Sequence, residues 1–292
     1  MPLAKTGITE STELTVKNLG PQIKWNYVFY IEYAGPIIIL PLLYLMGYKE
    51  QYNEIQCITL IMGVLHYLKR EYETAFVHVF SRFSMPIKRV FINSIHYWFF
   101  FAILNGLELF FFPDGHTYPT VVLALIIGVW AFAEFCNFKC HLVLSSFRQK
   151  KEKKEGDYVN ESKQRGIPYG WGFDLVSCAN YFWEAVGWIM FSILARTWAS
   201  YIFTGLSIYQ MLDWALKKHK NYKKEFGDKY PKGRKSMFPF IIWLNRPNHH
   251  VLFSLKISHH LSIYLNRFFS YNNYNFYVQS VYGYRSEASS DG

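Results

Sequence analysis

Carboxyl, phenol and amide side chains lie inside long apolar stretches of this 292-residue chain, where water is scarce. Asn180, Tyr181 and Glu184 stand near the start of one stretch, and Glu184 follows the other two at helical spacing, which places them close to one face. Glu32 and Tyr67 lie in two earlier stretches. Such groups can bind a polar ligand or transfer a proton. Because ionisable groups are costly in hydrocarbon, each is a candidate functional residue.

A second set of candidates follows the fourth apolar stretch and the last one. Asn137, His141 and Arg148 are spaced at i, i+4 and i+11, which places them close to one face of a helix that continues past the membrane. Tyr222 lies in a basic block at residues 217–234, directly after the last apolar stretch. A basic block in this position predicts an anionic partner at the membrane surface, such as a phosphorylated ligand or lipid headgroups.

The apolar stretches themselves indicate the class of protein. Apolar residues make up 51% of the chain and aromatic residues 20%, and they are gathered into long runs between basic loops. Six of these runs approach or reach the length that a helix needs to cross a bilayer. We therefore predict an all-α, polytopic membrane helical bundle of about six to seven transmembrane helices. The six candidate spans are 25–47, 53–68, 92–112, 119–138, 177–195 and 197–214.

Charged residues in the connections predict how the spans are oriented. Lys and Arg concentrate in residues 69–91, in residues 139–176 and after residue 214, whereas the other connections carry at most one each. By the positive-inside rule, both termini then lie in the cytosol. The polar candidates of five spans approach the same leaflet, which a shared cavity open to the cytosol would explain. The glycosylation sequon at Asn160 also falls in the cytosol, and we expect it to be unmodified.

The net charge of +10 admits two classes of partner. Nucleic acid is the ordinary partner of a basic protein. Here the positive residues flank apolar spans, which favours membrane lipids or a phosphorylated ligand, and no nucleic acid. Cys136, Cys140 and His141 are residue types that bind metal ions, but no second pair of such residues follows at zinc-finger spacing. We therefore expect no metal site.

Each candidate residue also has a purely structural interpretation. Glu32 could be wetted by headgroups at the interface, and Tyr67 could belong to the aromatic belt of the membrane surface. Asn137 and Asn180 could join helices by hydrogen bonds, and His141 could be a packed histidine. The functional interpretation depends on the convergence of these side chains at one leaflet and on no single one of them.

Several motifs of the chain are similar to those of a known family. They are Glu32-Tyr-Ala-Gly-Pro36, His66-Tyr67-Leu-Lys-Arg70, Glu73-Thr-Ala-Phe76-Val-His78, Ser177-Cys-Ala-Asn180-Tyr181-Phe-Trp-Glu184, and the run from Lys218-His219 through Pro239-Phe240-Ile241. The chain resembles the steroid 5α-reductase superfamily of endoplasmic-reticulum membrane reductases. Within it, the motifs after Glu32 and Glu73 are most similar to the very-long-chain trans-2-enoyl-CoA reductases. The resemblance covers about residues 17–242.

The resemblance implies a reaction, a cofactor and a set of site residues. The reaction is the reduction of trans-2-enoyl-CoA to saturated acyl-CoA in fatty-acid elongation, with NADPH as the cofactor. The implied partners are the long-chain enoyl-CoA, membrane lipids and other enzymes of elongation. The implied catalytic residues are Glu32, Tyr67 and Tyr181, and the implied cofactor-binding residues are Asn137, His141, Arg148, Asn180, Glu184 and Tyr222.

The chain departs from that family at both ends. We expect residues 1–20 to hold a remnant of an N-terminal region, residues 21–242 to form the membrane reductase domain, and residues 243–292 to form an atypical C-terminal extension. Two alternatives to the enoyl-CoA assignment stay open. One is a reductase of 3-oxo-steroids or polyprenols from the same superfamily. The other is a non-catalytic scaffold or lipid-binding membrane protein.

Overall fold

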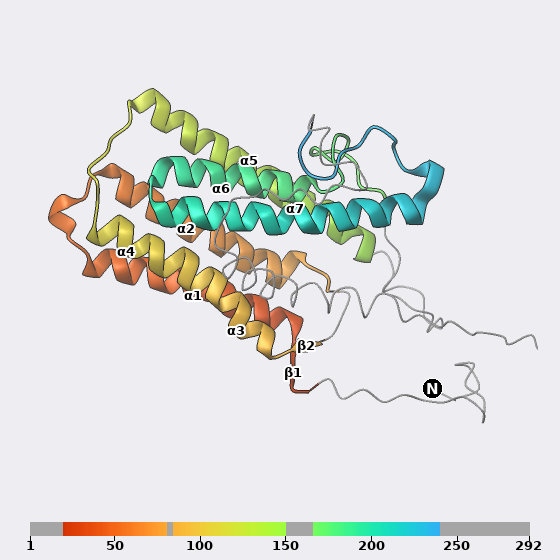
Figure 1. Ribbon diagram of the computed structural model, residues 1–292, viewed down its shortest axis with the longest axis horizontal. Helices are drawn as coiled ribbons and strands as arrows, with labels where there is room; N and C mark the ends of the chain where they lie inside the picture. Colours follow the sequence, from red (N-terminus) through yellow and green to blue (C-terminus); the bar gives the residue numbers. More distant parts are fainter. Residues whose placement is uncertain (1–19, 81–83, 150–165, 240–292) are drawn as a thin grey trace, which may run out of the picture.

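The computed structural model describes residues 20–80, 84–149 and 166–239. Six helical rods lie side by side along one axis, and a short two-stranded sheet lies at one end of this bundle (Figure 1). The expected all-α membrane bundle is thus confirmed, with the sheet as a small addition. The C-terminal extension, Asn160 and all of the N-terminal remnant except Gly20 lie outside the described residues.

Short connections join the rods in sequence order. The rods are α1 (Trp25–Met46), α2 (Glu54–Tyr72), a third rod made of α3 (Lys88–Ser94), the π-helical η4 (Ile95–Ile103) and α4 (Leu104–Phe111), then α5 (Thr120–Gln149), α6 (Ala179–Ala195) and α7 (Trp198–Phe226). The shorter elements are β1 (Gln22–Lys24), η2 (Lys49–Gln51), the π-helical η3 (Glu73–Val77), β2 (Ser84–Pro86) and η6 (Gly227–Lys229). β1 and β2 pair antiparallel, with Ile23 opposite Met85.

The rods agree with the six expected spans, but several of them are longer. α2 continues to Tyr72, α5 to Gln149 and α7 to Phe226, beyond the expected ends at 68, 138 and 214. Among the described helices, three are long and apolar enough to cross a membrane by length and composition: Trp25–Met46, Lys88–Phe111 and Thr120–Phe147. α6 is shorter, and α2 and α7 carry polar side chains that face the interior and lower their mean hydropathy.

Aromatic side chains fill the centre of the bundle. Phe101 of η4, Trp188 of α6 and Phe203 of α7 pack with their ring centroids between 4.9 and 5.1 Å apart. Apolar side chains such as Ile38 and Leu42 stay exposed on the outer surface, where lipid would cover them. Because lipid is as apolar as these side chains, close packing and interior hydrogen bonds must hold the rods together.

A hydrogen-bonded network closes the end of the bundle at which α4 meets the start of α7. The two carboxylate oxygens of Glu108 accept from the backbone N–H groups of Trp198 at 2.8 Å and Ala199 at 2.9 Å. These N–H groups have no partner within the first turn of a helix. Beside them, the Thr197 hydroxyl donates to Asn105 Oδ1 at 2.8 Å. Glu108 therefore caps α7 and ties it to α4.

Replacing Glu108 with alanine should lower the free energy of unfolding by about 1–2 kcal/mol, because two amide groups of α7 lose their acceptor. Thermal unfolding of the purified protein in detergent, followed by helical circular dichroism, would measure the change. Glu50→Ala is the matched control, since Glu50 is an exposed carboxylate on η2. Equal unfolding temperatures for the two variants would contradict the capping role.

Candidate active site

Tyr67 occupies the face of α2 that packs against α1 and η4. Its side chain is fully buried, and its ring centroid lies 6.0 Å from that of Tyr33, 5.9 Å from Tyr97 and 5.0 Å from Phe101. The hydroxyl oxygen of Tyr67 is also buried, and no described residue forms a hydrogen bond with it. A buried polar group without a partner destabilises a protein by about 1–3 kcal/mol. The Tyr67 hydroxyl therefore does not stabilise the fold, and it is available to form a hydrogen bond with a ligand.

Glu32 lies in the same buried region, one residue before Tyr33 on α1. Its side chain is 1% exposed, and its Oε2 accepts a hydrogen bond from Asn93 Nδ2 of α3 at 2.8 Å. No cation lies within ion-pair distance of Glu32 in the described part of the chain. The Glu32 carboxyl acts electrostatically on both Tyr33 and Tyr67, so the carboxyl of Glu32 and the phenol of Tyr67 belong to one region.

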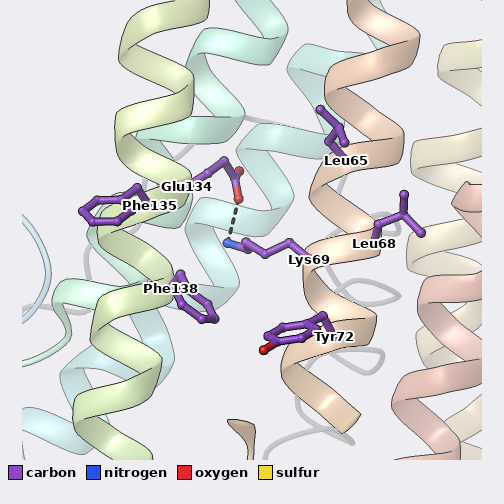
Figure 2. Close-up of a pocket in the computed structure, with 7 residues that line it drawn as sticks. All are labelled: Leu65, Leu68, Lys69, Tyr72, Glu134, Phe135 and Phe138. Carbon is purple, nitrogen blue, oxygen red and sulfur yellow. Dashed lines mark ion pairs between the residues drawn. The ribbon is translucent and has the colours of Figure 1, made fainter. Parts of the chain in front are cut away.

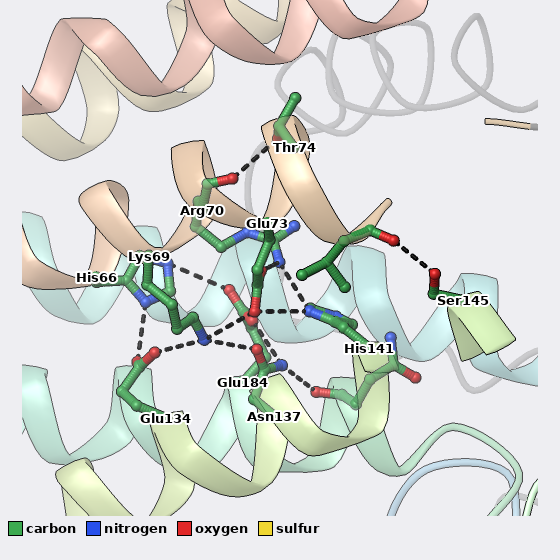
Figure 3. A network of polar contacts seen from close by, with 12 residues as sticks. His66, Lys69, Arg70, Glu73, Thr74, Glu134, Asn137, His141, Ser145 and Glu184 are labelled. Atoms are coloured by element: carbon green, nitrogen blue, oxygen red, sulfur yellow. Dashed lines mark hydrogen bonds and ion pairs between the residues drawn. The ribbon is translucent and has the colours of Figure 1, made fainter. Parts of the chain in front are cut away.

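A different face of α2 meets α5 and α6 in a network of buried polar side chains (Figure 3). His66 Nδ1 lies 2.9 Å from Glu134 Oε1, and His66 Nε2 lies 3.4 Å from Glu184 Oε1. Lys69 Nζ lies 2.6 Å from Glu134 Oε2 and donates to Asn137 Oδ1 at 2.6 Å. Asn137 Nδ2 donates in turn to Glu184 Oε2 at 2.9 Å. The network joins three helices through charged groups.

Arg70 connects this network to the Tyr67 region. Its Nη2 donates to the Tyr33 hydroxyl at 3.0 Å, and its Nη1 lies 2.5 Å from Glu73 Oε2 and 3.2 Å from His141 Nδ1. Burial alone would raise the pKa of Glu73, but the neighbouring Arg70 and His141 outweigh it and hold this pKa well below its usual range. Glu73 therefore stays ionised and fixes Arg70 between the two regions.

The start of α6 aims its two neighbouring candidates in different directions. The backbone carbonyl of Asn180 accepts from Asn137 Nδ2 at 2.9 Å, whereas the side-chain Oδ1 of Asn180 is buried with no partner among the described residues. Tyr181 instead packs towards α7, with its ring centroid 6.1 Å from that of Trp214. Asn180 thus joins the α5 network, and Tyr181 lies on the α7 side of α6.

The segment after α7 folds back onto the start of α6. Ser177 N donates to the backbone carbonyl of Lys235 at 2.8 Å, and Ser177 Oγ contacts the Tyr230 hydroxyl at 2.5 Å and His219 Nδ1. Burial, together with the cations of Lys223 and Lys235, lowers the pKa of His219 to about 4. The His219 ring is therefore neutral at neutral pH, and its Nε2 has no hydrogen-bond partner among the described residues.

Arg234, in the same segment, is a buried cation that forms no ion pair with any described residue. Its side chain is 2% exposed, and none of its three guanidinium nitrogens has a hydrogen-bond partner in the described structure. The guanidinium carbon lies 4.7 Å from the ring centroid of Tyr169 and 5.6 Å from that of Tyr230, on which Tyr222 stacks. A buried charge without a partner is strongly destabilising. The guanidinium fork matches phosphate geometry, so an anionic ligand would remove this penalty.

Glu73, His78 and His141 bring together possible metal ligands, whose atoms lie within 4.8 Å of one another. Arg70 and Lys69 already form ion pairs with the Glu73 carboxylate, at 2.5 and 3.8 Å. Two cations beside the central carboxylate repel a divalent metal ion. The geometry therefore favours an ion-pair cluster here, and the absence of a metal site stays a prediction.

An open groove of about 500 Å³ lies between α2 and α5 (Figure 2). Lys69 and Glu134 face each other across it. The α2 side chains of the groove lie at i, i+3, i+4 and i+7, a face opposite to that of Tyr67. The groove therefore opens away from the candidate catalytic pair. Its remaining lining is apolar or aromatic: Leu65, Leu68, Tyr72, Phe135 and Phe138.

The structure groups most of the residues that the sequence singled out. Glu32 and Tyr67 share one buried region, while Tyr181 and Tyr222 lie on the α7 side. Arg148 belongs to α5, but its side chain is outside the described structure. The remaining candidates are connected directly or through Glu73 and Lys69: Asn137, His141, Asn180 and Glu184.

Sequence reasoning missed most of the charged members of the site. Glu134 had a signal, because it precedes Asn137 by three residues inside an apolar span and so shares its face. With the second span ending at residue 68, Lys69 and Arg70 counted only as loop charges. Arg234 had no signal, since its basic block offers many equivalent cations. The full set missed is Lys69, Arg70, Glu73, Glu134 and Arg234.

A helical bundle with an apolar outer surface, whose described part holds unpaired polar groups in its interior, is typical of a membrane protein that binds a ligand between its helices. Comparison with known proteins agrees. The model of a family described as 3-oxo-5-alpha-steroid 4-dehydrogenase matches residues 83–242. The chain is 42% identical to a Schizosaccharomyces pombe protein provisionally named an enoyl reductase, over 82% of this chain and 80% of that protein.

Two further relatives carry more specific names. The very-long-chain enoyl-CoA reductase of Dictyostelium discoideum is 39% identical over 82% of this chain and 78% of its own length. A human protein named trans-2,3-enoyl-CoA reductase-like is 30% identical over 78% of this chain and 64% of its own length. The chain therefore belongs to the steroid 5α-reductase superfamily and, within it, to the very-long-chain enoyl-CoA reductase family, as its motifs predict.

Proposed function

We propose that this protein reduces trans-2-enoyl-CoA to saturated acyl-CoA with NADPH, as the last reductive step of very-long-chain fatty-acid elongation. The names of its relatives support the substrate class. The observation that carries the proposal is the buried, unpaired hydroxyl of Tyr67 in the same region as the Glu32 carboxyl. A donor without an intramolecular partner is free to bind a substrate oxygen.

The Tyr67 hydroxyl would act on the thioester oxygen of the substrate. Addition of a hydride to the β-carbon places negative charge on that oxygen as an enolate, and a positioned donor stabilises this charge in the transition state. Glu32 has no ion-pair partner in the described structure, and a buried carboxyl in that situation is held as the neutral acid. A neutral Glu32 supports Tyr67 as a second donor.

The unpaired atoms of the site fit NADPH, which supplies the hydride when bound. Asn180 Oδ1 would accept a hydrogen bond from the cofactor, and Asn137 and Glu184 hold the start of α6 against α5. Arg234 and the neutral His219 would hold phosphate oxygens, close to Tyr222. The observation behind this assignment is that these buried groups lack partners within the described chain.

Completion of the reaction needs a proton at the α-carbon, and Tyr181 is our candidate for this acid. We further propose that the protein lies in the endoplasmic-reticulum membrane with both termini in the cytosol. The positive loops support this orientation. It would place the Arg234 end of the bundle on the cytosolic side, from which NADPH and acyl-CoA arrive.

Incubation of the purified protein with NADPH and a long trans-2-enoyl-CoA tests the proposal. The expected product is the acyl-CoA that is heavier by two hydrogen atoms, identified by mass spectrometry, with one NADPH oxidised per product formed. A 3-oxo-Δ4-steroid serves as the comparison substrate. Faster turnover of the steroid would favour the steroid reductase alternative, and no oxidation of NADPH with either substrate would favour a non-catalytic role.

Replacing Asn180 with alanine should raise the KM for NADPH about tenfold, which corresponds to the loss of one hydrogen bond. Turnover at saturating NADPH should change less, because the side chain is assigned to cofactor binding. Initial rates at varied NADPH concentration would separate the two quantities. An unchanged KM for NADPH would show that Asn180 serves only to pack α6 against α5.

A further inference from the structure

The hydrogen bond between Asn93 and Glu32 has a direction that matters for the chemistry proposed above. Asn93 Nδ2 donates to Glu32 Oε2 at 2.8 Å, and the two residues come from different rods, α3 and α1. Glu32 is 1% exposed and Asn93 is half-buried, so the carboxyl side of this contact is shielded from solvent. An amide N–H can only donate, and the oxygen that it contacts must therefore accept.

A neutral carboxylic acid has a carbonyl oxygen, which is its stronger acceptor, and one O–H group, which donates. The Asn93 donor at Oε2 favours the carbonyl form of that oxygen, and this places the proton on Oε1. Without Asn93, no donor on α3 selects one oxygen of Glu32, and the carboxyl can rotate or place its proton on the side away from Tyr67. The amide thus selects one of two proton positions.

We propose that Asn93 is a positioning residue, which holds the Glu32 carboxyl so that Oε1 carries the proton and supports the Tyr67 hydroxyl at the substrate oxygen. Asn93 touches neither substrate nor cofactor in this role and acts through Glu32. The inference rests on the proposed function of Glu32 and Tyr67. It adds a third rod to the catalytic unit, because α3 then orients a group of α1 towards one of α2.

Other titratable and charged groups face Glu32 and must be considered in any test by pH. Tyr33 lies next to it on α1, Arg70 and Glu71 act on it from α2, and Tyr97 lies one turn after Asn93 on the third rod. None of these groups differs between the variants described below. A change in the pH profile between variants therefore reports on residue 93.

Two substitutions test the role of the amide. Asn93→Ala removes the donor, and we expect turnover to fall about tenfold at every pH, the effect of one lost hydrogen bond, with little change in the KM for enoyl-CoA. Asn93→Asp keeps the shape of the side chain but can donate only when it is protonated. We expect its turnover to approach that of the wild type at low pH and to fall as the pH rises.

Asn105→Ala is the matched control, since Asn105 is a buried asparagine near the other end of the same rod. It should retain wild-type turnover and an unaltered pH profile, whatever its effect on stability. Thermal unfolding of all variants separates activity from folding. A merely structural role would make Asn93→Ala and Asn93→Asp lose turnover in parallel with stability and independently of pH.

The outcomes distinguish the inference from the function on which it rests. Wild-type protein that fails to reduce trans-2-enoyl-CoA with NADPH would overturn both. Two results with an active wild-type protein would overturn the role of Asn93 and leave the function intact. One is wild-type turnover in both Asn93 variants, and the other is a loss of turnover in both variants that does not depend on pH. A loss of turnover in Asn93→Ala, with recovery of Asn93→Asp at low pH, is the result that supports the role.

Discussion

Replacing Tyr67 with phenylalanine should lower the turnover of trans-2-enoyl-CoA by about 10²- to 10³-fold, the usual effect of removing one donor from a developing oxyanion. The fold should not suffer. The Tyr67 hydroxyl is buried and has no partner in the described structure, so its removal relieves a desolvation penalty. We therefore expect the unfolding temperature to stay the same or to rise. Initial rates and thermal unfolding of the same preparation would measure both effects.

The Tyr67 prediction has a close control on α1. Tyr44→Phe removes the same atom from a ring that stacks on Tyr52, with centroids 5.0 Å apart, at the end of α1 far from Glu32. This variant should keep wild-type turnover. The KM for enoyl-CoA should change little in Tyr67→Phe, because the lost interaction strengthens only in the transition state. Wild-type turnover in Tyr67→Phe would show that another group stabilises the enolate.

Replacing Arg234 with methionine should raise the KM for NADPH by about ten- to a hundredfold, the loss expected for a hydrogen bond to a charged group. The same change should stabilise the protein in the absence of cofactor. Arg234 is 2% exposed and has no anion among the described residues, and methionine fills a similar volume without a charge. Initial rates at varied NADPH concentration and unfolding temperatures with and without NADPH would measure these effects.

Two control variants accompany the Arg234 prediction. Arg234→Lys keeps the charge but loses the fork of donors, and we expect an intermediate KM for NADPH. Arg196→Met removes an exposed cation after α6, at the opposite end of the bundle, and should leave this KM unchanged. An Arg234→Met variant that binds NADPH normally and unfolds at a lower temperature would show that Arg234 serves the fold alone.

Both predictions follow from one physical property of the site. Most buried polar groups in proteins have hydrogen-bond partners, and the exceptions call for an explanation. Tyr67, Asn180 and Arg234 are such exceptions in the described structure, and they come from different elements. If ligands supply their missing partners, substitutions should weaken function and preserve stability. A side chain that serves the fold would show the reverse pattern.

The sequence alone was sufficient to predict the class of protein and most of the rods. Apolar runs are local features, and a helix is the structure that satisfies its own backbone in hydrocarbon. The motifs around Glu32, Tyr67 and Asn180 identified the family for the same reason, since each motif is contiguous. The ends of α2, α5 and α7 were less predictable, because helices continue past the membrane where hydropathy no longer marks them.

Only the tertiary structure decided which polar groups work together. The ring centroids of His66 and Tyr67 lie 5.0 Å apart, yet their partners differ: His66 pairs with Glu134 and Glu184, whereas Tyr67 packs on Tyr33 and Phe101. Successive side chains point in different directions around α2. Asn93 reaches Glu32, and Glu134 reaches Lys69, through the packing of separate rods. That Arg234 has no hydrogen-bond partner among the described residues is likewise visible only in the folded chain. Hydropathy and motif spacing are local, whereas these contacts depend on how the rods rotate and pack.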